Sequence, residues 1–99
     1  MRVVFSPEAR SEFEDAERYY EGEAPGLGGR FRAEVRSALQ RLRNWPLAAP
    51  IEGGGIRRLL LGRFPYKILY AVEPGLIYVL ALAHQHRAPQ YWVDRKGAP

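Results

Sequence analysis

Residues 64–92 read FPYKILYAVE-PG-LIYVLALAH-QHRAPQYW, a pattern typical of two strands, a tight turn between them and a polar segment behind them. We expect strands over residues 66–73 and 76–84. Pro74 and Gly75 indicate a type II turn, because proline presets the first turn angle and glycine accepts the positive one. The two strands should therefore pair antiparallel. Both histidines, His84 and His86, stand where the second strand ends, and rigid sheet rims often position functional side chains.

The N-terminal residues predict a short strand and a helix. The β-branched and aromatic run over residues 2–5 is typical of a strand. Ser6 can then cap a helix, and Pro7 suits its first position. Apolar residues recur along this helix at spacings of four, three and four, which places them on one face. These residues are Ala9, Phe13, Ala16 and Tyr20. We expect the helix to end at Gly22.

A second amphipathic helix is predicted over residues 27–44, before Trp45 and Pro46. Its apolar stripe consists of Leu27, Phe31, Val35, Ala38, Leu39 and Leu42. At 3.6 residues per turn, Arg32, Arg36 and Arg43 lie along one edge of this stripe, and Arg30 and Arg41 lie along the other. Such arginines often cover apolar surface with their stems and leave the head group in water. The short Gly/Pro connection predicts that the two helices form an antiparallel hairpin.

The rest of the chain completes one domain over residues 1–99. Residues 47–55 are expected to be a plain connector, although their three glycines would also suit a mobile edge, and residues 56–61 a further strand. No glycine-rich phosphate-binding motif is present. The fold class is therefore α+β, with an N-terminal strand and a two-helix antiparallel hairpin packed on a twisted, mainly antiparallel sheet of about four strands.

Composition excludes several classes of site. The chain contains no cysteine, so disulfides, thiolate zinc sites and cysteine nucleophiles are excluded, and a reducing cytoplasm is the expected location. Its apolar runs are too short to cross a membrane. His84 and His86 would share one strand face, as half of a metal site would, but no third ligand accompanies them. We therefore predict no metal and no cofactor.

Charge is unevenly distributed along the chain. Residues 1–24 contain seven acidic residues and three arginines, whereas residues 25–99 contain twelve basic and four acidic residues. The first segment therefore carries −4 and the second +8. This asymmetry favours an anionic partner, either a nucleic acid or an acidic protein.

The candidate functional residues are cations and aromatics on the strands and strand ends. We expect Arg58 and Lys67 to project from the sheet face that the helices leave bare. Cations interleaved with tyrosines can hold phosphates and stack bases, although tyrosine is also simply a good strand residue. For RNA cleavage, His84, His86 and Tyr91 would transfer protons, and Lys67, Arg58 and Arg87 would supply positive charge.

Several motifs agree in order and spacing with one known family. They are Ser6-Pro7-Glu8-Ala9, Tyr19-Tyr20, Pro25-Gly26-Leu27-Gly28 and the segments FPYKILY (64–70) and AHQHRAPQYW (83–92). Over nearly the whole chain they resemble the RelE/ParE superfamily of type II toxin–antitoxin toxins. The resemblance implies the same α+β fold, growth arrest, a role in plasmid stabilisation, and a cognate antitoxin, often acidic, that folds on binding.

The resemblance also implies one of two targets. RelE-like members cut mRNA in the ribosome, whereas ParE-like members poison DNA gyrase. The RelE-like site uses cations on the middle strands, an arginine after the last strand and a later tyrosine. Lys67, Arg58 and Tyr91 match these positions, but Leu60 and Gln85 stand where further cations are expected. The pattern of His84, Arg87 and Tyr91 is more similar to ParE.

The favoured hypothesis is thus a toxin that binds gyrase without being an enzyme. Its target-binding residues would be Arg57, Arg58, Arg63, Lys67, His84, His86, Arg87, Tyr91 and Trp92. The first alternative is a ribosome-dependent mRNA endoribonuclease (an mRNA interferase). Its catalytic candidates would be Arg58, Lys67, His84, Arg87 and Tyr91. The second alternative is a non-toxic protein-binding module.

Overall fold

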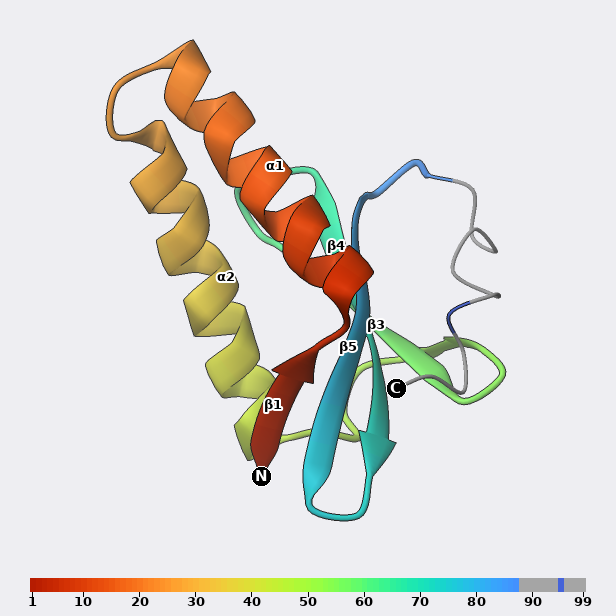
Figure 1. Ribbon diagram of the computed structural model, residues 1–99. Helices are drawn as coiled ribbons and strands as arrows, with labels where there is room; N and C mark the ends of the chain where they lie inside the picture. The colour runs from red at the N-terminus through yellow and green to blue at the C-terminus, as the bar shows by residue number, and fades with distance from the viewer. Residues whose placement is uncertain (88–94, 96–99) are drawn as a thin grey trace.

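The computed structural model describes residues 1–87 and residue 95 (Figure 1). Its elements, in chain order, are β1 (Arg2–Phe5), α1 (Pro7–Glu23), α2 (Leu27–Asn44), β2 (Ile51–Gly53), β3 (Ile56–Leu60), β4 (Tyr66–Glu73) and β5 (Leu76–His84). Within the described residues, five strands form one sheet in the order β1-β5-β4-β3-β2. β1 runs parallel to β5, and the other neighbours are antiparallel. The predicted α+β class is confirmed.

The sheet has one strand more than expected. The additional strand is β2, which lies inside the predicted connector and pairs with β3. It has only three residues and ends in glycine, so it lacks the alternation by which a strand is recognised. Gly54 and Gly55 take positive φ angles of 57° and 80° and turn the chain into β3. The prediction of a plain connector over residues 47–55 is therefore wrong for these three residues.

The two helices begin through different caps. At α1, the Ser6 hydroxyl accepts a hydrogen bond from the Ala9 N–H at 3.0 Å, as the sequence predicted. Gly26 precedes α2 and has no side chain to act as a cap. Glu21 of α1 supplies the missing acceptors, because its two carboxylate oxygens accept the Gly26 and Gly28 N–H groups at 3.0 Å each. A side chain of the first helix thus caps the second helix.

The hairpin covers one face of the sheet, and the main core lies between them (Figure 1). The apolar stripes predicted for both helices are confirmed. From α2, Phe31, Val35, Ala38 and Leu42 are buried; from the sheet, Ile68, Tyr70, Ile77, Val79 and Leu82 are buried against them. Phe31 is completely buried, and such a side chain contributes about 1.5–3 kcal/mol relative to an exposed one.

The opposite face carries a second, smaller apolar cluster. It consists of Ile56, Leu69, Tyr78, Leu80 and Ala81. These residues are 0–6% exposed, so the centre of this face is apolar and buried. A β-bulge in β5 places two consecutive residues, Leu80 and Ala81, in this cluster. Leu69 pairs with Ala81 and Tyr70 pairs with Val79, so Leu80 is the additional residue of β5.

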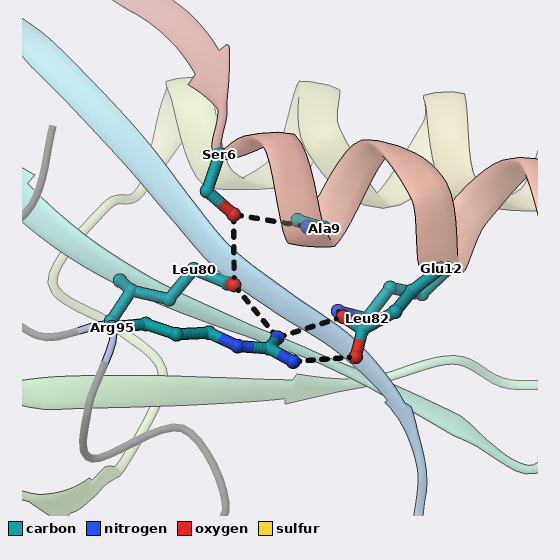
Figure 2. Close-up of polar contacts among 6 residues, drawn as sticks. All are labelled: Ser6, Ala9, Glu12, Leu80, Leu82 and Arg95. Carbon is teal, nitrogen blue, oxygen red and sulfur yellow. Dashed lines mark hydrogen bonds and ion pairs between the residues drawn. The ribbon is translucent and has the colours of Figure 1, made fainter.

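The side chains of Ser6, Glu12 and Arg95 satisfy backbone groups of β5 at this bulge and just after it (Figure 2). The Leu80 carbonyl accepts hydrogen bonds from the Ser6 hydroxyl at 3.0 Å and from Arg95 Nη1 at 3.2 Å. Glu12 accepts the Leu82 N–H at 3.0 Å and binds the Arg95 guanidinium through both oxygens, at 3.0 and 3.1 Å. Glu12 therefore joins three segments that are distant in sequence.

Candidate functional site

A pocket of about 480 Å³ lies on the side of the sheet away from the helices. It is lined by Glu52, Arg58, Leu60, Lys67, Gln85 and His86. Leu60 pairs with Lys67, and Arg58 pairs with Leu69, so these side chains share one side of the sheet. The prediction that Arg58 and Lys67 project from the same side is confirmed.

Lys67 is not an exposed cation within this pocket. Its ammonium lies 3.4 Å from Glu52 Oε1, and the two side chains are only 6% and 8% exposed. A buried ion pair is already neutralised, and removing Glu52 would leave the Lys67 ammonium buried without this counter-charge. Glu52 was not among the sequence-predicted site residues, because it stands in a segment that was expected to be a connector.

His84 lies on the helix side of the sheet. Its ring stands 5.8 Å from Tyr66 and 5.4 Å from His86, and its Nδ1 accepts the His86 N–H at 3.2 Å. Burial raises the pKa of Tyr66 above its usual value, with a smaller contribution from Tyr19.

Arg57 faces away from Arg58. Its Nη1 donates hydrogen bonds to the carbonyls of Leu47 and Ala49 at 3.0 and 2.6 Å, which ties the loop after α2 to the sheet. It pairs with Tyr70, whose side chain belongs to the helix-side core. Burial raises the Tyr70 pKa, and the charge of Arg57 partly opposes that shift. Arg57 therefore lies on a different surface from Arg58.

The remaining predicted residues are also dispersed. Arg63 lies in the β3–β4 loop and lines a separate pocket with Tyr20, Arg30 and Phe64. Its backbone N–H donates to Glu34 at 2.5 Å. The Arg87 N–H donates to the His84 carbonyl at 2.9 Å, in the turn after β5. Tyr91 and Trp92 lie outside the described residues. The candidate residues that the structure describes thus do not form a single continuous surface.

A third depression lies among β1, α1 and α2 and has a volume of about 420 Å³; we call it the arginine groove. Its apolar residues are Phe5, Phe13, Val35 and Leu39, and its cations are Arg10, Arg32, Arg36 and Arg43. The helical spacing had placed three of these arginines along one edge of the α2 stripe, and this placement is confirmed. The sequence had not singled them out as functional, because stripes of arginine are common on solvated helices.

Two kinds of feature are absent from the described part of the chain. Over residues 1–87 and 95, no cluster of three His, Asp or Glu side chains is arranged to hold a metal ion. In the same residues, neither helix is both long and apolar enough to span a bilayer.

The fold is shared with a known class of proteins. A solved structure described as "Chromosomal ParDE TA system from P. aeruginosa" superposes with a TM-score of 0.61 over 85% of this chain and 95% of the other. The two sequences are 17% identical, so this likeness establishes the fold. No curated protein matches the sequence.

Sequence comparison defines the family. The family model described as "ParE toxin of type II toxin-antitoxin system, parDE" matches residues 3–89. The chain therefore belongs to the ParE toxin family of type II toxin–antitoxin systems.

Proposed function

We propose that this chain arrests growth by binding DNA gyrase and that a cognate antitoxin neutralises it. Membership of the ParE toxin family supports this proposal over the RelE-like alternative. The proposed target would place the activity in the cytoplasm. The protein would act as a ligand of the enzyme and would need no cofactor.

One structural observation favours binding of a target over cleavage of RNA. A ribonuclease of the RelE-like type needs cations where the phosphate develops charge in the transition state. Here the Lys67 ammonium is paired with Glu52, and both are buried. Leu60 and Gln85 line the same pocket and bring no charge. This arrangement is poorly suited to phosphodiester cleavage and compatible with a binding role.

The test begins with expression in a bacterial host that lacks any antitoxin. Growth arrest is expected on induction. The purified protein, shown to be folded by circular dichroism, should then inhibit supercoiling of relaxed plasmid by gyrase at micromolar concentration. Loss of supercoiling activity together with intact transcripts would support the proposal.

The other two hypotheses predict different outcomes. A ribonuclease would produce new 5′ ends on translated mRNA in primer extension and leave purified gyrase active. A non-toxic binding module would permit normal growth. Either result, obtained with folded protein, would refute the gyrase proposal.

A further inference from the structure

The two helices of the hairpin carry opposite charges. Helix α1 contains seven acidic residues and two arginines, a net charge of −5, whereas α2 contains five arginines and one acid, Glu34, a net charge of +4. The Glu34 carboxylate is already engaged, because it accepts the Arg63 N–H at 2.5 Å on the side of the β3–β4 loop. The charge asymmetry of the sequence therefore becomes an asymmetry between two neighbouring helices.

The outer face of α2, opposite its buried stripe, has arginines along both edges. Arg36 and Arg43 stand on the edge beside the arginine groove, and Arg30 stands on the edge beside the pocket that Arg63 lines. Arg41 shares the edge of Arg30, because the two residues lie about three helical turns apart. The four α2 arginines of this face are exposed, and no described segment crosses the outer side of the helix (Figure 1).

These four guanidinium groups are not used within the fold. Over the part of the chain that the structure describes, Arg30, Arg36, Arg41 and Arg43 make neither a hydrogen bond nor an ion pair. The fifth arginine of α2, Arg32, differs, because it forms an ion pair with Glu17 of α1. Like charges gathered on one helix repel one another, and an anionic partner would relieve this repulsion.

The strip between the two rows of arginines is small and polar. It consists of five exposed residues, Gly29, Ala33, Ser37, Gln40 and Asn44. A protein partner would be anchored by aromatic or aliphatic side chains at the centre of its interface, and this strip offers none. Serine, glutamine and asparagine are instead side chains that contact phosphate oxygens. The outer face of α2 is thus better suited to a phosphate backbone than to an acidic protein.

We propose that the outer face of α2 binds the phosphate backbone of the duplex DNA that gyrase holds, without reading its sequence. The inference rests on the proposed function for the source of the DNA. From Arg30 to Arg43 the helix rises by about 20 Å, a length over which each strand of a duplex presents roughly six phosphates. The four arginines can therefore contact phosphates at the same time. The acidic α1 repels DNA, which leaves α2 as the helix that faces the duplex.

Fluorescence anisotropy with a labelled duplex of about 20 base pairs measures this contact directly. Four phosphate contacts predict a slope of log K against log salt of about −3.6, which is a roughly hundredfold loss of affinity from about 50 to about 200 mM salt. R30Q and R41Q should each reduce the magnitude of this slope by about 1. R18Q is the matched control, because Arg18 is an exposed arginine of α1 and its loss changes the net charge equally.

R18Q should bind the duplex as the wild type does. An equal loss of affinity with R18Q, or an affinity that does not change with salt, would overturn the proposal. Tighter binding of a polyglutamate peptide or of an RNA duplex with the same number of charges would also overturn it, because the face would then belong to another class of partner.

Binding to gyrase with and without the duplex tests the role of the contact. A toxin that touches both the enzyme and its DNA makes the second contact within one complex, so the duplex should tighten binding of the wild type to gyrase by about tenfold or more. The variant R30Q/R36Q/R41Q/R43Q, shown to be folded by circular dichroism, should bind gyrase alone as the wild type does and gain nothing from added DNA. An equal gain for both proteins would refute the role of this face.

The same measurements separate this inference from the proposed function. If the wild type inhibits gyrase but binds the duplex no better than the fourfold variant does, only the assignment of the α2 face fails. If the wild type binds the duplex as predicted but gyrase stays active, only the gyrase assignment fails.

Discussion

The ammonium of Lys67 in β4 reaches over β3 to Glu52 in β2, with 3.4 Å between Nζ and Oε1. Because β3 lies between these two strands, the ion pair attaches the three-residue edge strand to the middle of the sheet. It also removes a free cation from the pocket in which a ribonuclease would need one. One contact thus contributes to both the stability of the edge and the chemistry of the pocket.

Removing one partner of this pair should destabilise the protein strongly. We expect K67M and E52Q each to lower the free energy of unfolding by about 3 kcal/mol, because each change removes one charge of a buried ion pair. The double variant should lose less than the sum of the two. Urea unfolding of the four proteins measures this coupling, and additive losses would contradict it.

The same double variant tests the mode of action. If the toxin acts by binding gyrase, K67M/E52Q should still inhibit supercoiling once circular dichroism shows that it is folded. A ribonuclease that relied on the Lys67 ammonium would lose activity by several orders of magnitude. Complete loss of toxicity in a folded double variant would therefore count against the binding mechanism.

Gly28 permits the close contact between the two helices. A Cβ added at Gly28 would stand 2.8 Å from the Glu17 carbonyl oxygen and 2.9 Å from Glu21 Oε1. G28A should therefore cost about 1–3 kcal/mol of stability through overpacking and loss of the cap. Gly29 is the matched control, because a Cβ there meets no atom within 4 Å. G29A should raise stability by about 0.5–1 kcal/mol, since alanine favours helix. A lower thermal midpoint for G29A than for G28A would refute this reasoning.

Glu12 is expected to contribute more to the stability of the fold than its neighbours on α1. E12A removes the acceptor of the Leu82 N–H and both contacts to Arg95, and should cost about 2 kcal/mol. E14A, an exposed change on the same helix, should stay within about 0.5 kcal/mol of the wild type. Chemical denaturation compares the two, and similar midpoints would show that the contacts in Figure 2 contribute little.

Alkaline pH should destabilise the fold through its tyrosines. Burial raises the pKa of Tyr20, Tyr66 and Tyr70 above the ordinary tyrosine value of 10.0. Above about pH 10 the unfolded chain releases these protons while the folded chain retains them. Stability is therefore fully present below pH 10 and falls as the pH rises towards the folded-state pKa values. Y70F removes one such group, so its stability should fall less steeply in this range; a profile parallel to that of the wild type would disprove this.

The elements that the sequence predicted correctly are those with strong local signals. Ser6 and Pro7 marked the start of α1, the apolar spacing defined α2, and Gly75, with a φ of 69°, closes the predicted turn. Strand β2 was missed because three residues carry no periodicity, and it exists through its pairing with β3 and the Lys67–Glu52 contact. Tertiary contacts of this kind leave no local pattern.

The site was harder to predict than the fold. Strand alternation correctly placed Arg58 and Lys67 on one side, but a sequence does not show that an ammonium will be buried against Glu52. Arg57 and Arg58 are adjacent and equally charged, yet strand alternation sends them to opposite faces. Helical spacing predicted that the α2 arginines of the arginine groove share one edge of the apolar stripe. The apolar lining of the groove could not be predicted in this way, because it combines residues from β1, α1 and α2.

The additional residue in β5 determines how the end of that strand is presented. Before Leu80, odd-numbered positions face the helices; after Ala81, even-numbered positions such as Leu82 and His84 do. If the same residues alternated regularly without the bulge, the imidazole of His84 would lie on the opposite face of the sheet. The bulge, as much as the identity of the residues, therefore decides which molecules the histidine can meet.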